Sequence, residues 1–261
     1  MDRQVALAAF DEQIRRRPQP QPPDGLVEQD DRVVRSVSPW GGWTGVTWSG
    51  LDRAGADAVI AAQVGRFAGW ASPWEWKYYS HDQPPDLPDR LRAAGFTPGP
   101  SEAVLVAEIA DLILDVPPPP GVALRAVVDE PGVEALVSLH DEVFGGDHSA
   151  VGRAVLAGLA RRPSATTAVL AVAGRTPIAA GRVEFHRGTE FASLWGGGTL
   201  PSWRGRGVFR SLVAYRAALA SGRGFRYLQV DASPDSQPIL QRLGFVMVAT
   251  TTPFTHPGGA G

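Results

Sequence analysis

Two glycines and three arginines gather in one short stretch of the C-terminal half, where they could bind an anion. Gly205 and Gly207 alternate with Arg204 and Arg206, and Arg210 follows shortly after. Glycine lets the backbone approach a ligand closely, and the free N–H groups of a following helix lie at the positive end of its dipole. With the added guanidinium charges, this pattern is typical of a pyrophosphate site. An ordinary glycine-rich turn with solvated arginines remains the alternative.

Two familiar nucleotide-binding loops fit this stretch less well. The Walker pattern ends in Gly-Lys-Ser/Thr, which the stretch lacks. The Rossmann fingerprint needs Gly-x-Gly-x-x-Gly, but Gly207 is followed by Val208, Phe209 and Arg210. Both loops are therefore disfavoured.

Carboxylates that could take a proton from a reacting group precede the loop and follow it. Asp231 ends the apolar run 227–231, and Glu184 and Glu190 flank a turn between two expected strands. A carboxylate in a site can act as a general base. The alternatives are a turn cap for Asp231, acting through Ser233, and solvated hairpin charges for Glu184 and Glu190.

A run of three glycines, 196–198, follows Trp195 in an expected strand. Such a run costs packing and conformational entropy, so it indicates a bulge or a close approach by a ligand. Gly198 and Thr199 are therefore candidates for main-chain contacts to a bound molecule.

The elements expected in the C-terminal half explain how these residues could meet. Strands are expected at 122–128, 167–173, 177–186, 190–199, 227–231 and 246–253, and helices at 131–144, 151–161, 208–222 and 238–243. On the first helix, His140 shares a face with apolar residues. The order mixes adjacent strands with a strand–helix–strand crossover, which predicts an α/β fold with a mixed sheet flanked by helices.

Four consecutive prolines, 117–120, form a stiff spacer that predicts two domains, 1–117 and 121–261. A weak internal repeat supports two copies of one fold. Residues 74–108 and 227–251 both follow the order strand, helix, Gly-Phe, strand. We interpret this as a duplication, although Gly-Phe after a helix is also a common C-cap followed by a core aromatic.

Composition narrows the function classes. The chain has 261 residues, a net charge of -2, no cysteine and five scattered histidines. The absence of cysteine excludes disulfides and a thiolate nucleophile, and the His spacing gives no metal motif, so no metal is expected. The balanced charge gives no reason to expect nucleic acid as a partner. We expect no membrane segment and a cytoplasmic protein, because no apolar stretch is long enough to span a bilayer.

The stretch Pro201–Phe209 resembles the acetyl-CoA pyrophosphate loop of the GNAT superfamily of N-acetyltransferases, whose pattern is Gln/Arg-x-x-Gly-x-Gly/Ala. Arg204 and Gly207 match, whereas Phe209 stands at the Gly/Ala position. The downstream Leu243-Gly244-Phe245 is similar to the end of the family's second cofactor segment. The N-terminal half resembles a degenerate GNAT copy without the loop. The chain thus looks like a tandem GNAT protein with one CoA site.

The resemblance implies an enzyme that moves an acetyl group from acetyl-CoA to a small amine or peptide by direct attack, as a monomer or homodimer. The implied cofactor-binding residues are Gly198, Thr199, Leu200, Arg204, Gly205, Arg206, Gly207, Val208 and Phe209. The implied catalytic candidates are Asp231, Glu184 and Ser233, the last standing where the family often has Asn. Leu240 occupies the position of the family's frequent acid, Tyr. A non-catalytic acyl-CoA sensor or scaffold is the alternative function.

Overall fold

The computed structural model describes residues 1–21, 24–39, 42–160 and 164–259. They form two compact units. The C-terminal unit contains Leu105–Asp231 and Pro238–Val246 together with Met1, and the N-terminal unit contains Asp2–Val104, Ala232–Gln237 and the residues from Met247 onward. These units divide the chain differently from the expected domains 1–117 and 121–261. The expected domains describe the two sequence repeats and remain a prediction.

A mixed sheet forms the centre of the C-terminal unit. Its strands lie in the order β7 (Val122–Ala126), β8 (Thr166–Ala173), β9 (Thr176–Phe185), β10 (Phe191–Thr199), β11 (Tyr227–Ala232) and β6 (Glu102–Glu108). The pairs from β7 to β10 are antiparallel, and β10 pairs with β11 in parallel. This confirms the predicted mixed sheet.

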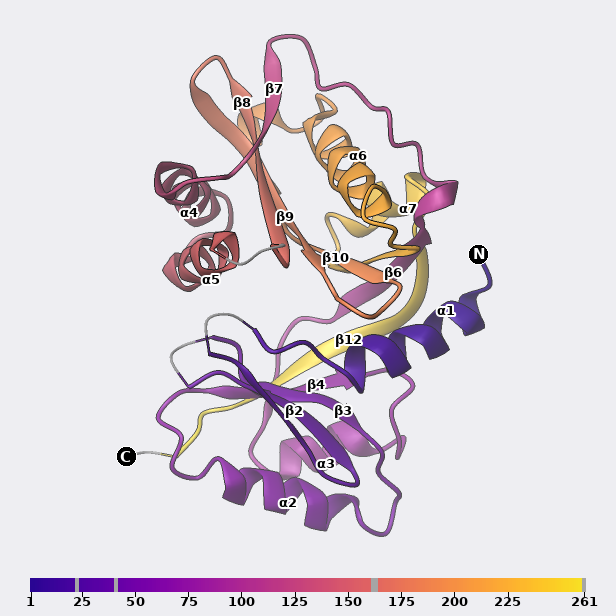
Figure 1. Ribbon diagram of the computed structural model, residues 1–261. Helices are drawn as coiled ribbons and strands as arrows, with labels where there is room; N and C mark the ends of the chain where they lie inside the picture. Colours follow the sequence, from indigo (N-terminus) through magenta and orange to yellow (C-terminus); the bar gives the residue numbers. More distant parts are fainter. Residues whose placement is uncertain (22–23, 40–41, 161–163, 260–261) are drawn as a thin grey trace. The chain divides into compact units, whose positions relative to one another are not determined.

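Helices cover both faces of this sheet (Figure 1). On one face, α4 (Glu130–Phe144) and α5 (Ser149–Leu159) pack through Leu136 and Val155 on Leu170. On the other face, α6 (Val208–Ser221) packs through Leu212 on Val169. Helix α5 begins two residues before its expected start, and Arg161 of that expectation lies outside the described residues. The short helix α7 (Gln237–Arg242) follows β11.

Helix α4 carries its own start and stop signals. The Asp129 carboxylate accepts a hydrogen bond from the Gly132 N–H at 3.0 Å, and Pro131 stands in the first turn. The helix ends at Gly145, whose φ of 72° suits glycine. These signals fix the length of α4 and the position of the loop to α5.

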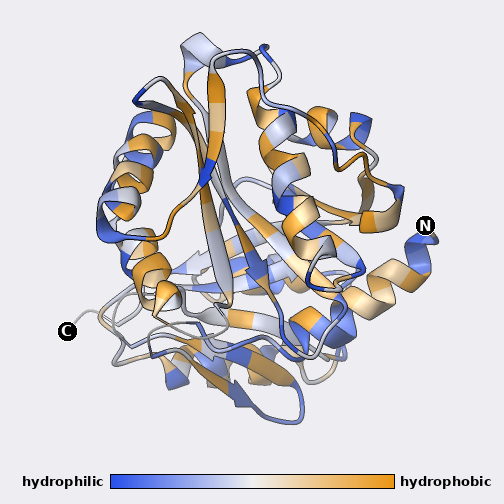
Figure 2. Cartoon of the chain, turned by 45° about the horizontal axis from the view of Figure 1, so that its top comes forward, coloured by the Kyte–Doolittle hydropathy of each residue, from blue (hydrophilic) through white to orange (hydrophobic). Residues whose placement is uncertain are grey.

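The N-terminal unit also contains both parallel and antiparallel strand pairs. Its strands lie in the order β1 (Leu26–Gln29), β2 (Val33–Val37), β3 (Gly45–Ser49), β4 (Trp74–Tyr79) and β12 (Val246–His256), and the two-residue β5 (Thr97–Pro98) also pairs with β12. Strands β3 and β4 are parallel, whereas β4 and β12 are antiparallel. Helices α2 (Ala56–Arg66) and α3 (Leu87–Ala93) bury Ile60 and Leu91 in a core with Trp74 and Trp76. Figure 2 shows hydrophobic (orange) and hydrophilic (blue) residues on both the helices and the strands of the chain.

The two Gly-Phe corners of the predicted repeat have the same local structure. Gly95 and Gly244 both have positive φ, 94° and 105°. The following Phe96 and Phe245 are each 3% exposed. Each donates its N–H to the carbonyl five residues earlier, at 3.0 Å to Leu91 and 3.1 Å to Leu240. These shared corners support the duplication.

The final strands of the repeats do not stay with the strands before them. Residues Leu105–Glu108 of β6 belong to the C-terminal unit, and β12 from Met247 onward belongs to the N-terminal unit, where it pairs with β4 over six residue pairs from Thr251 to His256. Each repeat therefore supplies its last strand to the other unit.

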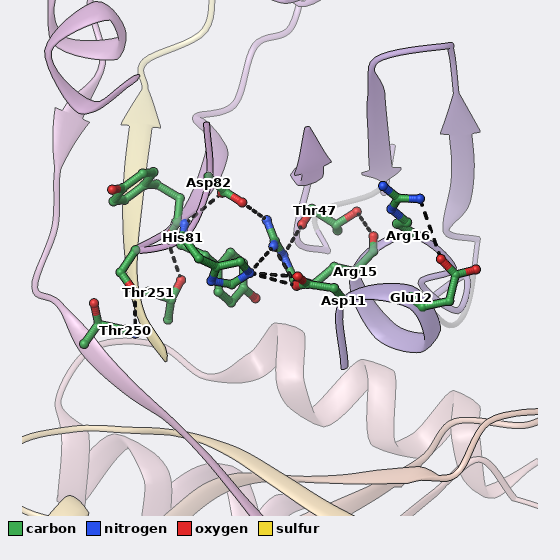
Figure 3. Close-up of polar contacts among 12 residues, drawn as sticks. Asp11, Glu12, Arg15, Arg16, Thr47, His81, Asp82, Thr250 and Thr251 are labelled. Carbon is green, nitrogen blue, oxygen red and sulfur yellow. Dashed lines mark hydrogen bonds and ion pairs between the residues drawn. The ribbon is translucent and has the colours of Figure 1, made fainter. Parts of the chain in front are cut away.

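A buried ion pair fixes the N-terminal helices in their unit (Figure 3). Helix α1 (Arg3–Phe10) continues as a π-helix, Asp11–Arg15, and Arg15 is 2% exposed. Its guanidinium lies 2.7 Å from both Asp82 and Asp11, and 3.8 Å from the centroid of the Tyr79 ring. Burial raises the pKa of Asp82, although Arg15 acts against this shift. No local sequence pattern predicts this network.

Candidate functional site

The parallel ladder between β10 and β11 ends halfway along both strands. It covers 191–193 on β10 and 227–229 on β11, yet β10 continues to Thr199 and β11 to Ala232. On its other side, β10 stays paired with β9 but carries a bulge between Trp195 and Gly198. The region 194–199 of β10 is thus freed from β11 and bent at the same place.

The glycine run produces this bulge, and side chains of the protein itself cover each glycine. A Cβ at Gly196 would lie 2.7 Å from the His140 ring, and the φ of Gly196 is 56°. A Cβ at Gly197 would lie 3.0 Å from Phe209, and one at Gly198 would lie 2.8 Å from Phe144. The sequence predicted a bulge or a close approach by a ligand at these glycines. The structure has the bulge, and the groups that approach the glycines closely are side chains of α4 and α6.

Two buried side chains grip the bulge from opposite faces. From α4, the His140 ring places Nε2 3.0 Å from the Gly196 carbonyl oxygen. From α6, Arg216 donates to the carbonyl oxygens of Arg182 at 3.2 Å and Trp195 at 3.5 Å. Burial, with the charge of Arg182 as a second cause, lowers the pKa of His140 to about 4 and that of Arg216 to about 10. At neutral pH His140 is therefore neutral and Arg216 is charged.

The glycine–arginine loop lies between the end of β10 and the start of α6. Gly205 and Gly207 have φ of 74° and 85°, and no described atom lies within 4 Å of a Cβ built on either. No described side chain caps the N-terminus of α6, which begins at Val208. Since the first-turn N–H groups have no partner within the helix, the loop and helix form an open, positively polarised cradle.

Arg204 and Thr199 join the cradle to the strand. The Arg204 Nε donates to the Thr199 carbonyl oxygen at 3.1 Å. The Thr199 hydroxyl is buried without a hydrogen-bond partner among the described residues. An unsatisfied buried hydroxyl costs about 1–3 kcal/mol, so it calls for a partner that the protein itself does not supply. Leu200 follows, and Arg206 lies over the Trp203 ring at 5.0 Å.

An apolar groove of about 360 Å³ extends from the first turn of α6. One face of α6 and the end of α7 line it, together with the chain before the proline run. The lining residues are Leu112, Ile113, Val116, Arg210, Val213, Ala214, Ala217, Ile239, Arg242 and Leu243. The groove could take an apolar part of a ligand whose charged part occupies the cradle.

The predicted carboxylates share the sheet face on which α4 lies. Glu184 is paired with Ser193, and Ser193 with Gln229, so these three side chains point to the same face. Asp231 lies two residues beyond Gln229 on that face, and its Oδ1 accepts from the Gln229 amide at 2.8 Å. The Glu184 carboxylate accepts from Arg182 at 3.0 Å. The structure therefore places both candidates on the face where the bulge is held by His140.

Ser233 and Leu240 have structural contacts of their own. Ser233 begins a turn, since its carbonyl accepts from the Ser236 N–H at 3.1 Å and its hydroxyl lies 3.2 Å from the Ser236 hydroxyl. The Leu240 side chain is 1% exposed in the C-terminal unit. The position of the expected acid is therefore an apolar core residue.

A second histidine near the bulge was not anticipated from the sequence. The Asp141 Oδ1 accepts from both the backbone N–H and the ring Nδ1 of His148, each at 2.9 Å. The His148 ring lies 5.6 Å from that of His140 and 5.9 Å from that of Phe144, between centroids. Because seven positions and a loop separate the pair, no short motif indicated it.

Within the described part of the chain, no group of three or more His, Asp or Glu side chains is placed to hold a metal ion. None of its helices is long and apolar enough to cross a membrane.

No protein-family model and no curated protein matches the chain. Solved structures do. A GCN5-related N-acetyltransferase from Kribbella flavida is 20% identical, with a TM-score of 0.71, and the match covers 98% of this chain and 96% of that one. A GCN5-related N-acetyltransferase from Sphaerobacter thermophilus is 16% identical, with a TM-score of 0.58, over 89% and 83%.

A tandem GNAT protein from the clavulanic acid biosynthesis pathway matches over 99% of this chain and 95% of that one, at 14% identity and a TM-score of 0.60. The chain therefore has the fold of the GNAT acetyltransferases over nearly its whole length. This confirms the predicted fold class, a mixed sheet flanked by helices.

Proposed function

We propose that the chain is an acetyl-CoA-dependent N-acetyltransferase that moves an acetyl group to an amine by direct attack. One observation carries this proposal. The cradle of Gly205, Gly207 and the uncapped start of α6 opens at the end of β10, just beyond the point where β10 and β11 stop pairing. It offers an anion site beside the part of β10 that has parted from β11, which suits a phosphate-bearing thioester.

The described residues fit acetyl-CoA as a substrate. Arg204, Arg206 and the N–H groups from Val208 onward would hold the pyrophosphate, with Phe209 packed behind them on Gly197. The buried Thr199 hydroxyl and the backbone of Gly198 and Leu200 would bind the pantetheine arm. The apolar groove beside Arg210 would receive a less polar part of the molecule.

Asp231 is our candidate for holding the acceptor amine. It lies on the α4 face of the sheet, in the part of β11 that β10 has left. Glu184 shares this face but is paired with Arg182, so it is the second candidate. Ser233 has a turn contact with Ser236, and we give it no step in the transfer.

Calorimetric titration with acetyl-CoA tests the cofactor site. Arg204→Ala and Arg206→Ala should each weaken binding about tenfold, because each removes a charge-assisted contact to phosphate. Arg175→Ala, in the exposed β8–β9 turn, is the matched control and should bind normally. Failure of the wild type to bind acetyl-CoA at millimolar concentration would refute the proposal.

A non-catalytic acyl-CoA sensor is the second candidate, favoured by the apolar Leu240 at the position of the expected acid. Release of free thiol from acetyl-CoA, measured across a panel of amines, separates the two. The chain has no cysteine, so a thiol reagent reports only CoA. Amine-dependent release supports the transferase, and tight binding without release supports the sensor.

A further inference from the structure

The hydrogen bond from the His148 backbone N–H to Asp141 closes the loop between α4 and α5, and the bond from the His148 ring goes beyond this role. His148 lies at the start of α5, and Asp141 lies in the last turn of α4. The pair lies near the glycine run, because Phe144, the last residue of α4, covers Gly198 and its ring lies 5.9 Å from the His148 ring, between centroids. The His148 side chain is 24% exposed, so it is held by the protein yet reachable from solvent.

The hydrogen bonds of this pair fix the state of the ring. Since a carboxylate oxygen only accepts, the His148 nitrogen 2.9 Å from Asp141 is a donor, and Nδ1 carries a proton. In the neutral ring, Nε2 then has the free lone pair. A histidine oriented by a carboxylate through one nitrogen and basic at the other is the arrangement of a general base.

His140 cannot take this role, although it lies nearer the bulge. It is 1% exposed, and its Nε2 is engaged with the Gly196 carbonyl oxygen. The His140 ring contacts the bulge, and the His148 ring lies 5.6 Å from the His140 ring, between centroids. The two histidines thus have different tasks, one holding the strand and the other facing outward.

We propose that His148, oriented by Asp141, is the catalytic base of the transfer and also the acid that the chain lacks at Leu240. This inference rests on the proposed function. The neutral amine attacks the thioester carbonyl carbon, the new C–N bond forms, and the C–S bond breaks. His148 Nε2 takes the proton from the attacking nitrogen and returns it to the departing thiolate sulfur. One proton moves from nitrogen to sulfur, and the ring ends as it began.

The charged groups around His148 are known from the elements packed there. Helix α4 contributes Asp141 and the neutral His140, and the loop contributes Asp147. Strand β9 contributes Arg182, whose charge acts on His140. Only Asp141 is in hydrogen-bond contact with the His148 ring among these groups. Asp141 is a positioning residue, because it acts through His148.

The test compares variants in the thiol-release assay, with acetyl-CoA and the amine from the panel that the wild type uses best. His148→Gln should lower kcat at least about 100-fold, the usual size of a general-base contribution, and leave acetyl-CoA affinity within twofold. It should also remove the acidic limb of the pH profile of kcat/KM. Asp141→Asn should lower kcat less, and free imidazole should partly restore His148→Ala.

Glu142→Gln is the control, since it removes an exposed carboxylate next to Asp141 and should leave turnover unchanged. Wild-type turnover that survives His148→Gln within threefold would overturn the assignment and leave the transferase standing. Lower turnover with the acidic limb intact would overturn it too, because another group would then take the proton. A wild type that releases no thiol with any amine would overturn both proposals.

Discussion

His140 donates its Nε2–H to the carbonyl oxygen of Gly196 at 3.0 Å, and this contact ties helix α4 to the bulge in β10. The φ of Gly196 and the nearness of the His140 ring both exclude a side chain at that position. The part of β10 that has parted from β11, where we place the thioester, is therefore held by an imidazole that is neutral at neutral pH.

The stability of the protein should depend on pH through His140. Its pKa is lowered from 6.5 to about 4 in the folded state, so on acidification the unfolded chain binds the proton first. The contribution of His140 to the free energy of unfolding should be fully present above pH 6.5. Between pH 6.5 and pH 4, the free energy of unfolding should fall by roughly 3 kcal/mol because of this residue. Urea denaturation at several pH values measures this.

His140→Gln supplies the control for that experiment. Its amide can still donate to the Gly196 carbonyl but does not titrate. The free energy of unfolding that is lost between pH 6.5 and 4 should therefore be smaller in the variant, by the amount that His140 contributes in the wild type. Equal pH dependence in the wild type and the variant would contradict the role given to His140.

Gly196→Ala should destabilise the protein by about 2 kcal/mol or more. The added Cβ would lie 2.7 Å from the His140 ring and force alanine into a left-handed conformation. Gly65→Ala, in α2, meets no described atom within 4 Å and should be neutral or stabilising by up to about 1 kcal/mol. Thermal unfolding of both variants gives the comparison, and similar effects would argue against a special role of Gly196.

Asp82→Ala should cost about 3–5 kcal/mol, because it leaves the buried Arg15 guanidinium without one of its carboxylates. Asp89→Ala breaks an exposed pair with Arg92 and should cost less than about 1 kcal/mol. Chemical denaturation measures both. A small effect of Asp82→Ala would mean that water replaces the lost carboxylate.

Asp231→Asn should raise the KM for the amine about tenfold or more while acetyl-CoA affinity stays the same. The variant keeps an oxygen for the Gln229 amide, so the fold should persist. Steady-state kinetics against both substrates separates the roles. If kcat falls at least about 100-fold and the acidic limb of the pH profile disappears, Asp231 is the base instead of His148. If neither constant changes, Glu184 becomes the better candidate.

Local signals were sufficient for part of this structure. The loop from Arg204 to Val208 was recognised because its glycines and charges are adjacent in sequence, and the glycine run indicated the bulge. The Gly-Phe corners were visible for the same reason. Which side chains cover the three glycines was not, because Phe144, His140 and Phe209 come from two helices whose packing no local pattern fixes.

The contacts that the sequence did not predict join residues far apart along the chain. His140 was placed on the apolar face of its helix, but its carbonyl partner lies 56 residues away. Arg15 and Asp82 are 67 residues apart and carry no common motif. The assignment of β12 to the sheet of β4 was also missed, since a strand's hydrophobic pattern does not say which neighbour it will choose.

The exchanged final strands have a consequence for the history of the chain. A fragment cut at the proline run would carry β12 without the β4 edge it pairs with, and would lack the residues of β6 that complete the sheet beside β11. If the two repeats arose by duplication, as their shared corners suggest, a split of the gene at this point would leave each product short of a strand that its sheet needs. The two products would then have to be made together to fold.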